Sequence, residues 1–274
     1  MTKAFPTASK LVTARPRKLI HLLLEISLIA RRNLLLDLRN LGVIIGATGF
    51  PVFLLLVFTA SFAKVVMPNG SYADYAQFLV PLVIVQGLLF STTSIGISLH
   101  NDLESGIDRR LRSLPISQAT VLTGRILSSA VRLFIQGVMI TGVGYLLGFR
   151  FQNGYLTTLP FLILPVIFSA SFAWFAALLA VKVKTAESVQ ISMIPWLLPL
   201  TFLSIGYVPK ESFPDWLQGF VELNPVSTAT QALRGLSSNG LVTTSVIKTL
   251  LWSFALTLVF GTWAIHAYQR KGQN

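Results

Sequence analysis

Hydrophobic residues along this chain gather into six blocks, each about as long as one crossing of a lipid bilayer. The hydrocarbon core is about 30 Å thick and an α-helix rises about 1.5 Å per residue, so about 20 apolar residues cross it as a helix. We therefore expect an all-α membrane protein, with transmembrane helices at about residues 41–63, 78–99, 131–148, 157–181, 189–207 and 248–268. Together they would form one six-span domain over residues 41–274.

The chain ahead of the first block is polar and basic. Residues 1–16 form a tail interrupted by prolines, and a segment of mixed character follows at residues 17–40. Charged residues recur every seven positions in that segment: Lys18, Glu25, Arg32 and Arg39. This spacing places them on one face of a helix whose apolar run is too short to cross a bilayer. We expect an amphipathic helix on the membrane surface, with its basic residues near anionic head groups.

Composition supports a membrane protein and excludes a nucleic-acid-binding one. Of 274 residues, 53% are hydrophobic and only 12% are charged, against about a quarter charged in soluble domains. The net charge of +12 sits at the ends of the apolar blocks. With a cytoplasmic N-terminus and an even number of crossings, 17 of the 22 Lys and Arg residues fall on the cytoplasmic side. This bias predicts a multi-pass protein with both termini in the cytoplasm.

No pattern in the sequence indicates catalysis. The chain has no cysteine, and its three histidines (His21, His100 and His266) are scattered. Zinc-protease, hydrolase-elbow and phosphate-binding-loop motifs are all absent, so we expect no enzyme active site, no metal site and no ATP site in this chain. Energy for transport would then come from an ion, a proton or a partner subunit.

Polar residues inside the predicted spans are few. The candidates for a substrate pathway are Gln86, Thr92, Thr93, Gln136 and Trp196. Glutamine and threonine at membrane depth also serve as hydrogen-bonding groups between helices, and aromatic residues also face lipid, so both interpretations remain open. The predicted spans contain no acidic residue, which counts against a proton relay.

Two connections stand out. The cytoplasmic loop at residues 100–117 is highly charged, and it is either a solvated connection or a docking element for a soluble partner. Its candidate contact residues are Asp102, Glu104, Gly106, Asp108, Arg109, Arg110, Arg112 and Pro115. The external segment at residues 208–247 is long and half apolar, with helical spacing after Pro214, so we expect one or two short helices at the outer interface.

Three motifs resemble those of ABC-2 type permeases. The run from Gly106 to Ile116 (GIDRRLRSLPI) resembles the cytoplasmic loop of the daunorubicin/doxorubicin-resistance subgroup, whereas the wider family more often has Thr and Glu where this chain has Ile107 and Arg109. The external segment is similar in three places: Phe213-Pro214-x-Trp216-Leu217, Asn224-Pro225-Val226-Ser227 and Ala232-Leu233-Arg234. The third motif is Gly148-Phe149-Arg150-Phe151.

The resemblance implies one membrane subunit of a type V-like ABC exporter in a bacterial plasma membrane. It further implies a second permease, identical or a sister, and separate nucleotide-binding ATPase subunits that hold ATP and Mg. The helix at 17–40, with Glu25 and Arg32, and the loop at 100–117 would contact the ATPase. The external segment would gate the exit through Phe213, Pro214, Trp216, Asn224, Pro225 and Arg234. The implied substrates are amphipathic drugs or complex lipids.

Two alternatives belong to other functional classes. A standalone secondary transporter or channel predicts intramembrane carboxylates or repeated broken helices, and neither occurs in the sequence. A non-transporting scaffold subunit is compatible with every pattern above. An ATPase that co-purifies with the chain, and needs it for hydrolysis, would distinguish an exporter subunit from both.

Overall fold

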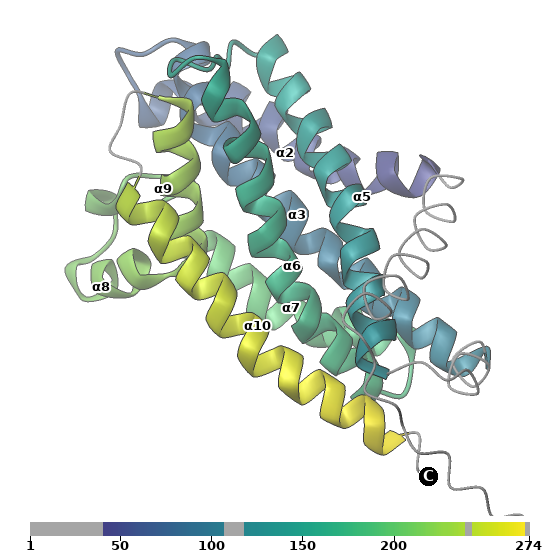
Figure 1. Cartoon of the computed structure of the whole chain (residues 1–274). Coiled ribbons are helices and arrows are strands. Elements are labelled where there is room, and N and C mark those ends of the chain that lie inside the picture. The colour runs from purple at the N-terminus through teal and green to yellow at the C-terminus, as the bar shows by residue number, and fades with distance from the viewer. Residues whose placement is uncertain (1–40, 107–117, 239–242, 272–274) are drawn as a thin grey trace, which may run out of the picture.

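The computed structural model describes residues 41–106, 118–238 and 243–271, and these residues form an all-α bundle (Figure 1). Its elements are α2 (Leu41–Val66), α3 (Tyr72–Glu104), α5 (Gln118–Leu146), η1 (Tyr155–Thr157), α6 (Thr158–Lys182), α7 (Ala186–Phe202), η2 (Lys210–Ser212), α8 (Asp215–Leu223), α9 (Pro225–Ser237) and α10 (Thr243–Lys271). The predicted surface helix at 17–40 lies outside the described residues. The all-α prediction is confirmed for the part of the chain that the structure describes.

Five of these helices are long and apolar enough to cross a membrane: α2, α3, α5, α6 and α10. The span predicted at residues 189–207 falls on α7, which has 17 residues and ends at Phe202. At about 1.5 Å per residue α7 is about 25 Å long, somewhat shorter than the hydrocarbon core. Two prolines, Pro195 and Pro199, lie inside it.

Helix α3 is the centre of the bundle. It packs against α2, α5, α6, α7 and α9, and its 33 residues begin with a capping box formed by Ser71 and Asp74. Two glycines allow neighbours to approach α3 closely. A Cβ atom on Gly87 would lie 2.8 Å from Cγ of Pro51 in α2, and one on Gly96 would lie 2.9 Å from the Ala176 carbonyl in α6. The packing of α3 therefore depends on small residues at the crossing points, as is common in membrane bundles.

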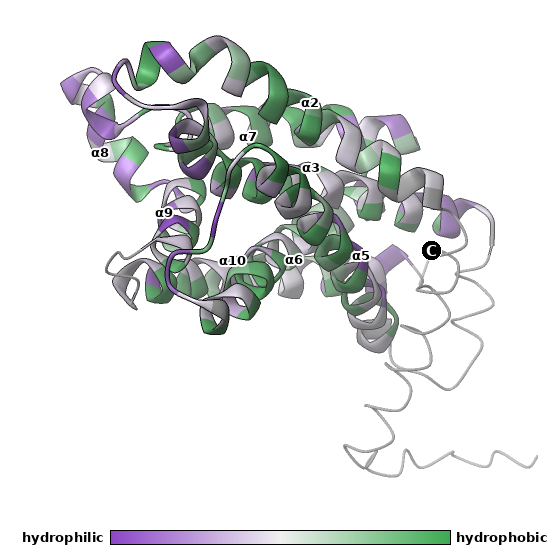
Figure 2. Ribbon diagram, turned by 90° about the horizontal axis from the view of Figure 1, so that it is seen from above, coloured by the Kyte–Doolittle hydropathy of each residue, from purple (hydrophilic) through white to green (hydrophobic). Residues whose placement is uncertain are grey.

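The outer surface of the bundle is apolar. Figure 2 shows hydrophobic residues running along α2 and α7, whereas hydrophilic residues gather at α8 and its loops. Large apolar side chains are exposed along two helices in particular, including Phe50 and Phe53 of α2 and Phe254 and Leu258 of α10. Such continuous exposure is typical of a surface in contact with lipid rather than water.

The two ends of the bundle can be told apart by contacts between helix termini. At one end, the start of α3 meets the end of α9 through the connection that follows α5. At the other end, His100 near the end of α3 and Lys271 at the end of α10 both contact the last turn of α6. We call these the α9 end and the opposite end.

Candidate functional site

Asn224 joins the end of α7 to the start of α9. Its Nδ2 donates to the carbonyl oxygens of Leu200 (2.8 Å) and Leu203 (2.7 Å), at the end of α7. Its Oδ1 accepts from the backbone N–H of Val226 (2.8 Å), which caps the start of α9. A helix end leaves carbonyls or N–H groups without partners, and a buried group of this kind is costly. One buried amide thus satisfies both helix ends at once.

Ser227 and Arg234 extend this junction along one face of α9. Ser227 Oγ accepts from the backbone N–H of Ile205, 3.1 Å away. The Arg234 guanidinium donates to the carbonyls of Ile205 (2.9 Å) and Gly206 (2.7 Å) after α7, and to that of Phe78 (3.0 Å) in α3. It also stacks on the Phe78 ring, 3.4 Å from the centroid. Helix α9 therefore clamps the turn after α7 onto α3.

Arg234 is a partly buried cation held by backbone dipoles. Burial lowers the pKa of Arg234 to about 9, partly offset by Tyr75, and this value leaves the guanidinium charged at neutral pH. Arg234 and Asn224 were both predicted to belong to an external gate. The structure places both at the joint between α3, α7 and α9, where Asn224 is buried and Arg234 is partly buried, and a role in a gate stays a prediction.

The connection after α5 closes the other end of α9. Asn153 Nδ2 donates to the carbonyls of Gly235 (2.9 Å) and Ser238. The backbone N–H of Gln152 donates to the carbonyl of Ser237 (2.9 Å). This connection contains Gly148, whose φ of +102° suits glycine. The motif that begins with Asn224 thus starts α9, and the residues directly after the motif at 148–151 contact the end of α9.

The remaining predicted gate residues lie in α8 or directly beside it. Trp216 is 81% exposed, Pro214 is exposed and Phe213 is half-buried, while Pro225 is buried at the start of α9. On the next turns Phe220 and Leu223 are also exposed. The spacing 216, 220 and 223 places an apolar face of α8 outside the subunit.

Gln136 compensates for a proline in a neighbouring helix. Pro51 has no N–H, so the carbonyl of Ala47 lacks its usual helical donor. Gln136 Nε2 donates to that carbonyl (3.1 Å) and to the carbonyl of Gly87 (3.4 Å), and Gln136 Oε1 accepts from Ser91 Oγ (2.7 Å). This single side chain links α2, α3 and α5 in the core.

The other polar pathway candidates also have partners within the subunit. Gln86 Oε1 accepts from the Tyr207 hydroxyl (2.6 Å), and the Thr92 hydroxyl donates to its own helix at Leu89 (2.6 Å). Thr93 is buried, whereas Trp196 is 61% exposed on α7. Within one subunit, Gln86 and Gln136 therefore connect helices, and Trp196 faces outward.

The opposite end holds the described part of the predicted ATPase contact. Helix α3 continues to Glu104, so Asp102 and Glu104 stand on its last turn rather than in a loop, and Gly106 follows with φ of +74°. Asp102 pairs with Arg125 of α5, and Glu104 lies 3.2 Å from His100. The other predicted contact residues lie outside the described residues: Glu25, Arg32, Asp108, Arg109, Arg110, Arg112 and Pro115.

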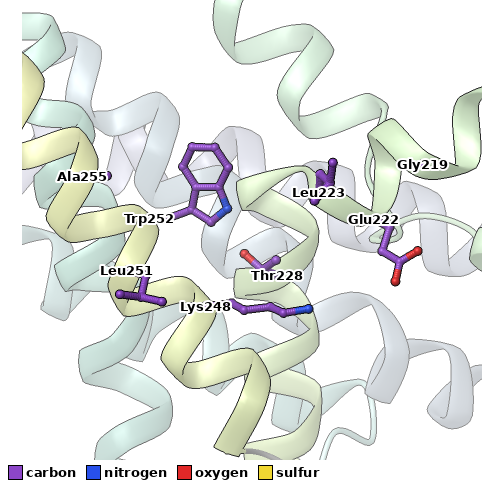
Figure 3. Close-up of a pocket in the computed structure, with 8 residues that line it drawn as sticks. All are labelled: Gly219, Glu222, Leu223, Thr228, Lys248, Leu251, Trp252 and Ala255. Atoms are coloured by element: carbon purple, nitrogen blue, oxygen red, sulfur yellow. The ribbon is translucent and has the colours of Figure 1, made fainter.

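A groove that the sequence did not reveal runs along α10. Its volume is about 740 Å³, and its walls come from α6, α7, α8 and α10, with Trp196, Trp252 and Trp263 among the lining residues. A second hollow of about 590 Å³ adjoins it toward the start of α10 and shares Leu223 and Trp252 with it. In Figure 3, Lys248 extends from α10 toward the helix that carries Glu222. Hydrophobic blocks indicate helices but not the spaces between them.

Comparison with known proteins gives a consistent result. Residues 25–237 match the family model described as ABC-2 type transporter. The chain is 31% identical over 241 residues to the probable doxorubicin resistance ABC transporter permease protein DrrC of Mycobacterium tuberculosis, covering 86% of this chain and 85% of that protein. It is 32% identical over 228 residues to the daunorubicin resistance ABC transporter permease protein DrrB1 of Streptomyces coeruleorubidus, covering 82% and 78%.

Proposed function

The chain belongs to the ABC-2 type transporter family, and from that premise we propose that it is the six-span membrane subunit of a bacterial exporter of amphipathic drugs or lipids. The observation that carries this proposal is the likeness to named drug-resistance permeases along most of both chains. A permease subunit of an ABC exporter is the function that these relatives share. The drug substrate is carried over from their names, and the apolar groove supports an amphipathic or lipid substrate.

ATP hydrolysis belongs to a separate subunit in this proposal. The printed sequence has no phosphate-binding loop, and a family permease works with a nucleotide-binding partner. We propose that this partner docks on the opposite end of the bundle, between α3 and α5. The charged run at residues 108–112 and the exposed Glu104 support this side, as does the excess of basic residues that marks cytoplasmic segments.

The sixth span of the proposal is α7 together with the turn after it. Helix α7 alone is short, but Asn224 at the start of α9 holds the end of α7 in the bundle. A second permease subunit, identical or a sister, would complete a type V-like exporter. Exposed apolar surface on α2, α7 and α8 supports a partner within the membrane.

The decisive experiment co-expresses the chain with its nucleotide-binding partner and measures ATPase activity in reconstituted vesicles. We expect the two to purify together and hydrolysis to depend on the permease. An ATPase that neither binds this chain nor responds to it would contradict the exporter function and favour a secondary transporter or a scaffold.

Charge reversals test the docking site. Asp102 is a poor choice, because it pairs with Arg125 and its loss would disturb the α3–α5 contact. Glu104→Lys and Arg110→Glu leave that pair intact, and we expect both to weaken ATPase association. Glu211→Lys, at an exposed position in η2, is the matched control and should bind the ATPase normally. If the reversals at 104 and 110 behave like the control, docking lies elsewhere.

A further inference from the structure

The apolar groove along α10 continues into a basic hollow at the opposite end of the bundle. This hollow has a volume of about 590 Å³ and shares Leu178, Lys182 and Trp263 with the groove. Its remaining lining includes His266 and Arg270, on the last turns of α10. The two hollows therefore form one continuous surface, apolar along most of its length and basic where α6 and α10 end.

The length of the apolar part matches one leaflet of a bilayer. Along α6 it extends from Phe172 to Lys182, and along α10 from Trp252 to Trp263. At about 1.5 Å per residue these stretches measure about 15 Å and about 16 Å. Half of a hydrocarbon core about 30 Å thick is about 15 Å. A single acyl chain that entered from one leaflet would find a groove of its own length.

Helices α7 and α10 form opposite walls of the groove over a floor provided by α6. Helix α6 packs closely on α10 and also contacts α7. The Phe175 ring of α6 contacts an aromatic ring of each wall, with centroid distances of 6.2 Å to Trp196 in α7 and 4.8 Å to Phe260 in α10. Aromatic side chains thus line both walls and the floor. Such a surface suits a flexible hydrocarbon chain, which needs apolar contact but no hydrogen bonds.

The charges select the sign of the head group. Lys182 lies beside the groove with its Nζ 5.9 Å from the Trp263 ring, and Lys182 and Arg270 both line the basic hollow. No carboxylate lines that hollow among the described residues. The far hollow differs, since groups of both signs line it: Lys248 lies there together with Glu222, which binds Lys210 at 2.6 Å. Only the Lys182 end is lined by basic groups without a carboxylate, so an anionic group is favoured there.

We propose that this surface binds one anionic membrane lipid, with its head group at Lys182 and Arg270 and an acyl chain along the groove between α7 and α10. The orientation proposed above makes the cytoplasmic leaflet its source, since that leaflet meets the opposite end of the bundle. The binding itself requires no transport activity. It adds to the export function a specific lipid site on the permease.

Tryptophan fluorescence reports on this site directly. Three of the five tryptophans of the chain line the groove, and the other two are Trp174 and Trp216. A Trp174→Phe/Trp216→Phe background leaves only groove tryptophans. The full chain in this background is reconstituted in phosphatidylcholine vesicles and titrated with phosphatidylglycerol whose acyl chains carry bromine, a quencher that acts at contact range. Brominated phosphatidylcholine serves as the neutral comparison.

We expect phosphatidylglycerol to quench at a clearly lower mole fraction than phosphatidylcholine. One basic residue near an anionic lipid contributes about 1 kcal/mol, so Lys182→Gln and Arg270→Gln should each weaken this preference roughly fivefold. Lys184→Gln removes one charge outside the groove and should leave the preference unchanged. Circular dichroism and elution as a single species show that each variant is folded.

Four results would overturn the proposal. One is equal quenching by the two lipids, which means a neutral annular surface. The second is an unaltered preference for phosphatidylglycerol in the Lys182→Gln/Arg270→Gln variant. The third is a loss of this preference in the control variant that equals the loss in the groove variants. Loss of all lipid quenching on formation of a permease dimer would assign the groove to a second copy instead. None of these results bears on ATPase dependence, so the lipid site and the exporter function fail separately.

Discussion

Replacing Asn224 by aspartate separates the two tasks of this side chain. Aspartate keeps the Oδ atom that accepts from the Val226 N–H, and it caps a helix start about as well as asparagine does. It cannot donate, however, so the carbonyls of Leu200 and Leu203 both lose their partner. A new carboxylate would face two carbonyl oxygens in a position that is 2% exposed.

The expected destabilisation follows from counting these groups. Each lost hydrogen bond to a buried carbonyl costs about 1 kcal/mol, and burial of a charge against two acceptors adds to that sum. We therefore expect Asn224→Asp to cost about 3 kcal/mol or more. Asn224→Ser keeps a cap, introduces no charge and should cost about 2 kcal/mol. For a chain of this size such losses correspond to a fall in Tm of roughly 5–10 °C.

The assay measures the apparent Tm of the full chain in detergent, read from the fraction of protein that stays monodisperse after heating. The order of the variants is the decisive result. If Asn224 served only as the cap of α9, Asn224→Asp would be at least as stable as Asn224→Ser. Wild-type stability of Asn224→Asp would refute the junction between α7 and α9.

Three further changes test other parts of the bundle by the same measurement. Gln136→Leu should lower the free energy of unfolding by about 2 kcal/mol. Adding Pro51→Ala should recover part of this loss, because alanine restores a backbone donor for the Ala47 carbonyl that Gln136 otherwise bonds. A double-mutant cycle without coupling would contradict this. Gly148→Ala should cost about 2 kcal/mol through its φ of +102°, and an unchanged Tm would contradict that strain. The hydrogen bond and charge of Lys210 lower the pKa of Glu222. The small excess in Tm of the wild type over Glu222→Gln should therefore be present above pH 4.5 and vanish as the pH falls through the lowered pKa. A Tm difference that grows in acid would be contrary to this.

The hydrophobic pattern predicted the fold class because it reports a solvent constraint. In a bilayer every backbone polar group needs an internal partner, so an apolar block of sufficient length must be helical. Five such blocks correspond to helices that satisfy the length and composition of a span. The pattern was less informative at α7, where Pro195 and Pro199 sit in an apolar stretch that continues past the end of the helix at Phe202.

The positions of individual polar residues were not predictable in the same way. Asn224 and Arg234 stand in the external segment, for which the resemblance to ABC-2 type permeases implied a gate. Their roles depend on carbonyls in α3 and after α7, and neither hydropathy nor spacing relates groups so distant in sequence. The same holds for Gln136, although Pro51 was a usable signal: a proline within a span requires some donor elsewhere.

The enclosure of α9 has a consequence for how the protein is made. Eleven of its 13 residues are buried, yet the helix is rich in Ser and Thr and carries a guanidinium, so it is too polar to enter lipid alone during synthesis. Its binding site does not exist until α3, α6 and α7 have been inserted and associated, and α10 then covers it. Assembly should therefore end with the docking of α9 and its covering by α10. Chains released before α10 is complete would expose a basic, hydrogen-bonding segment to quality-control proteases.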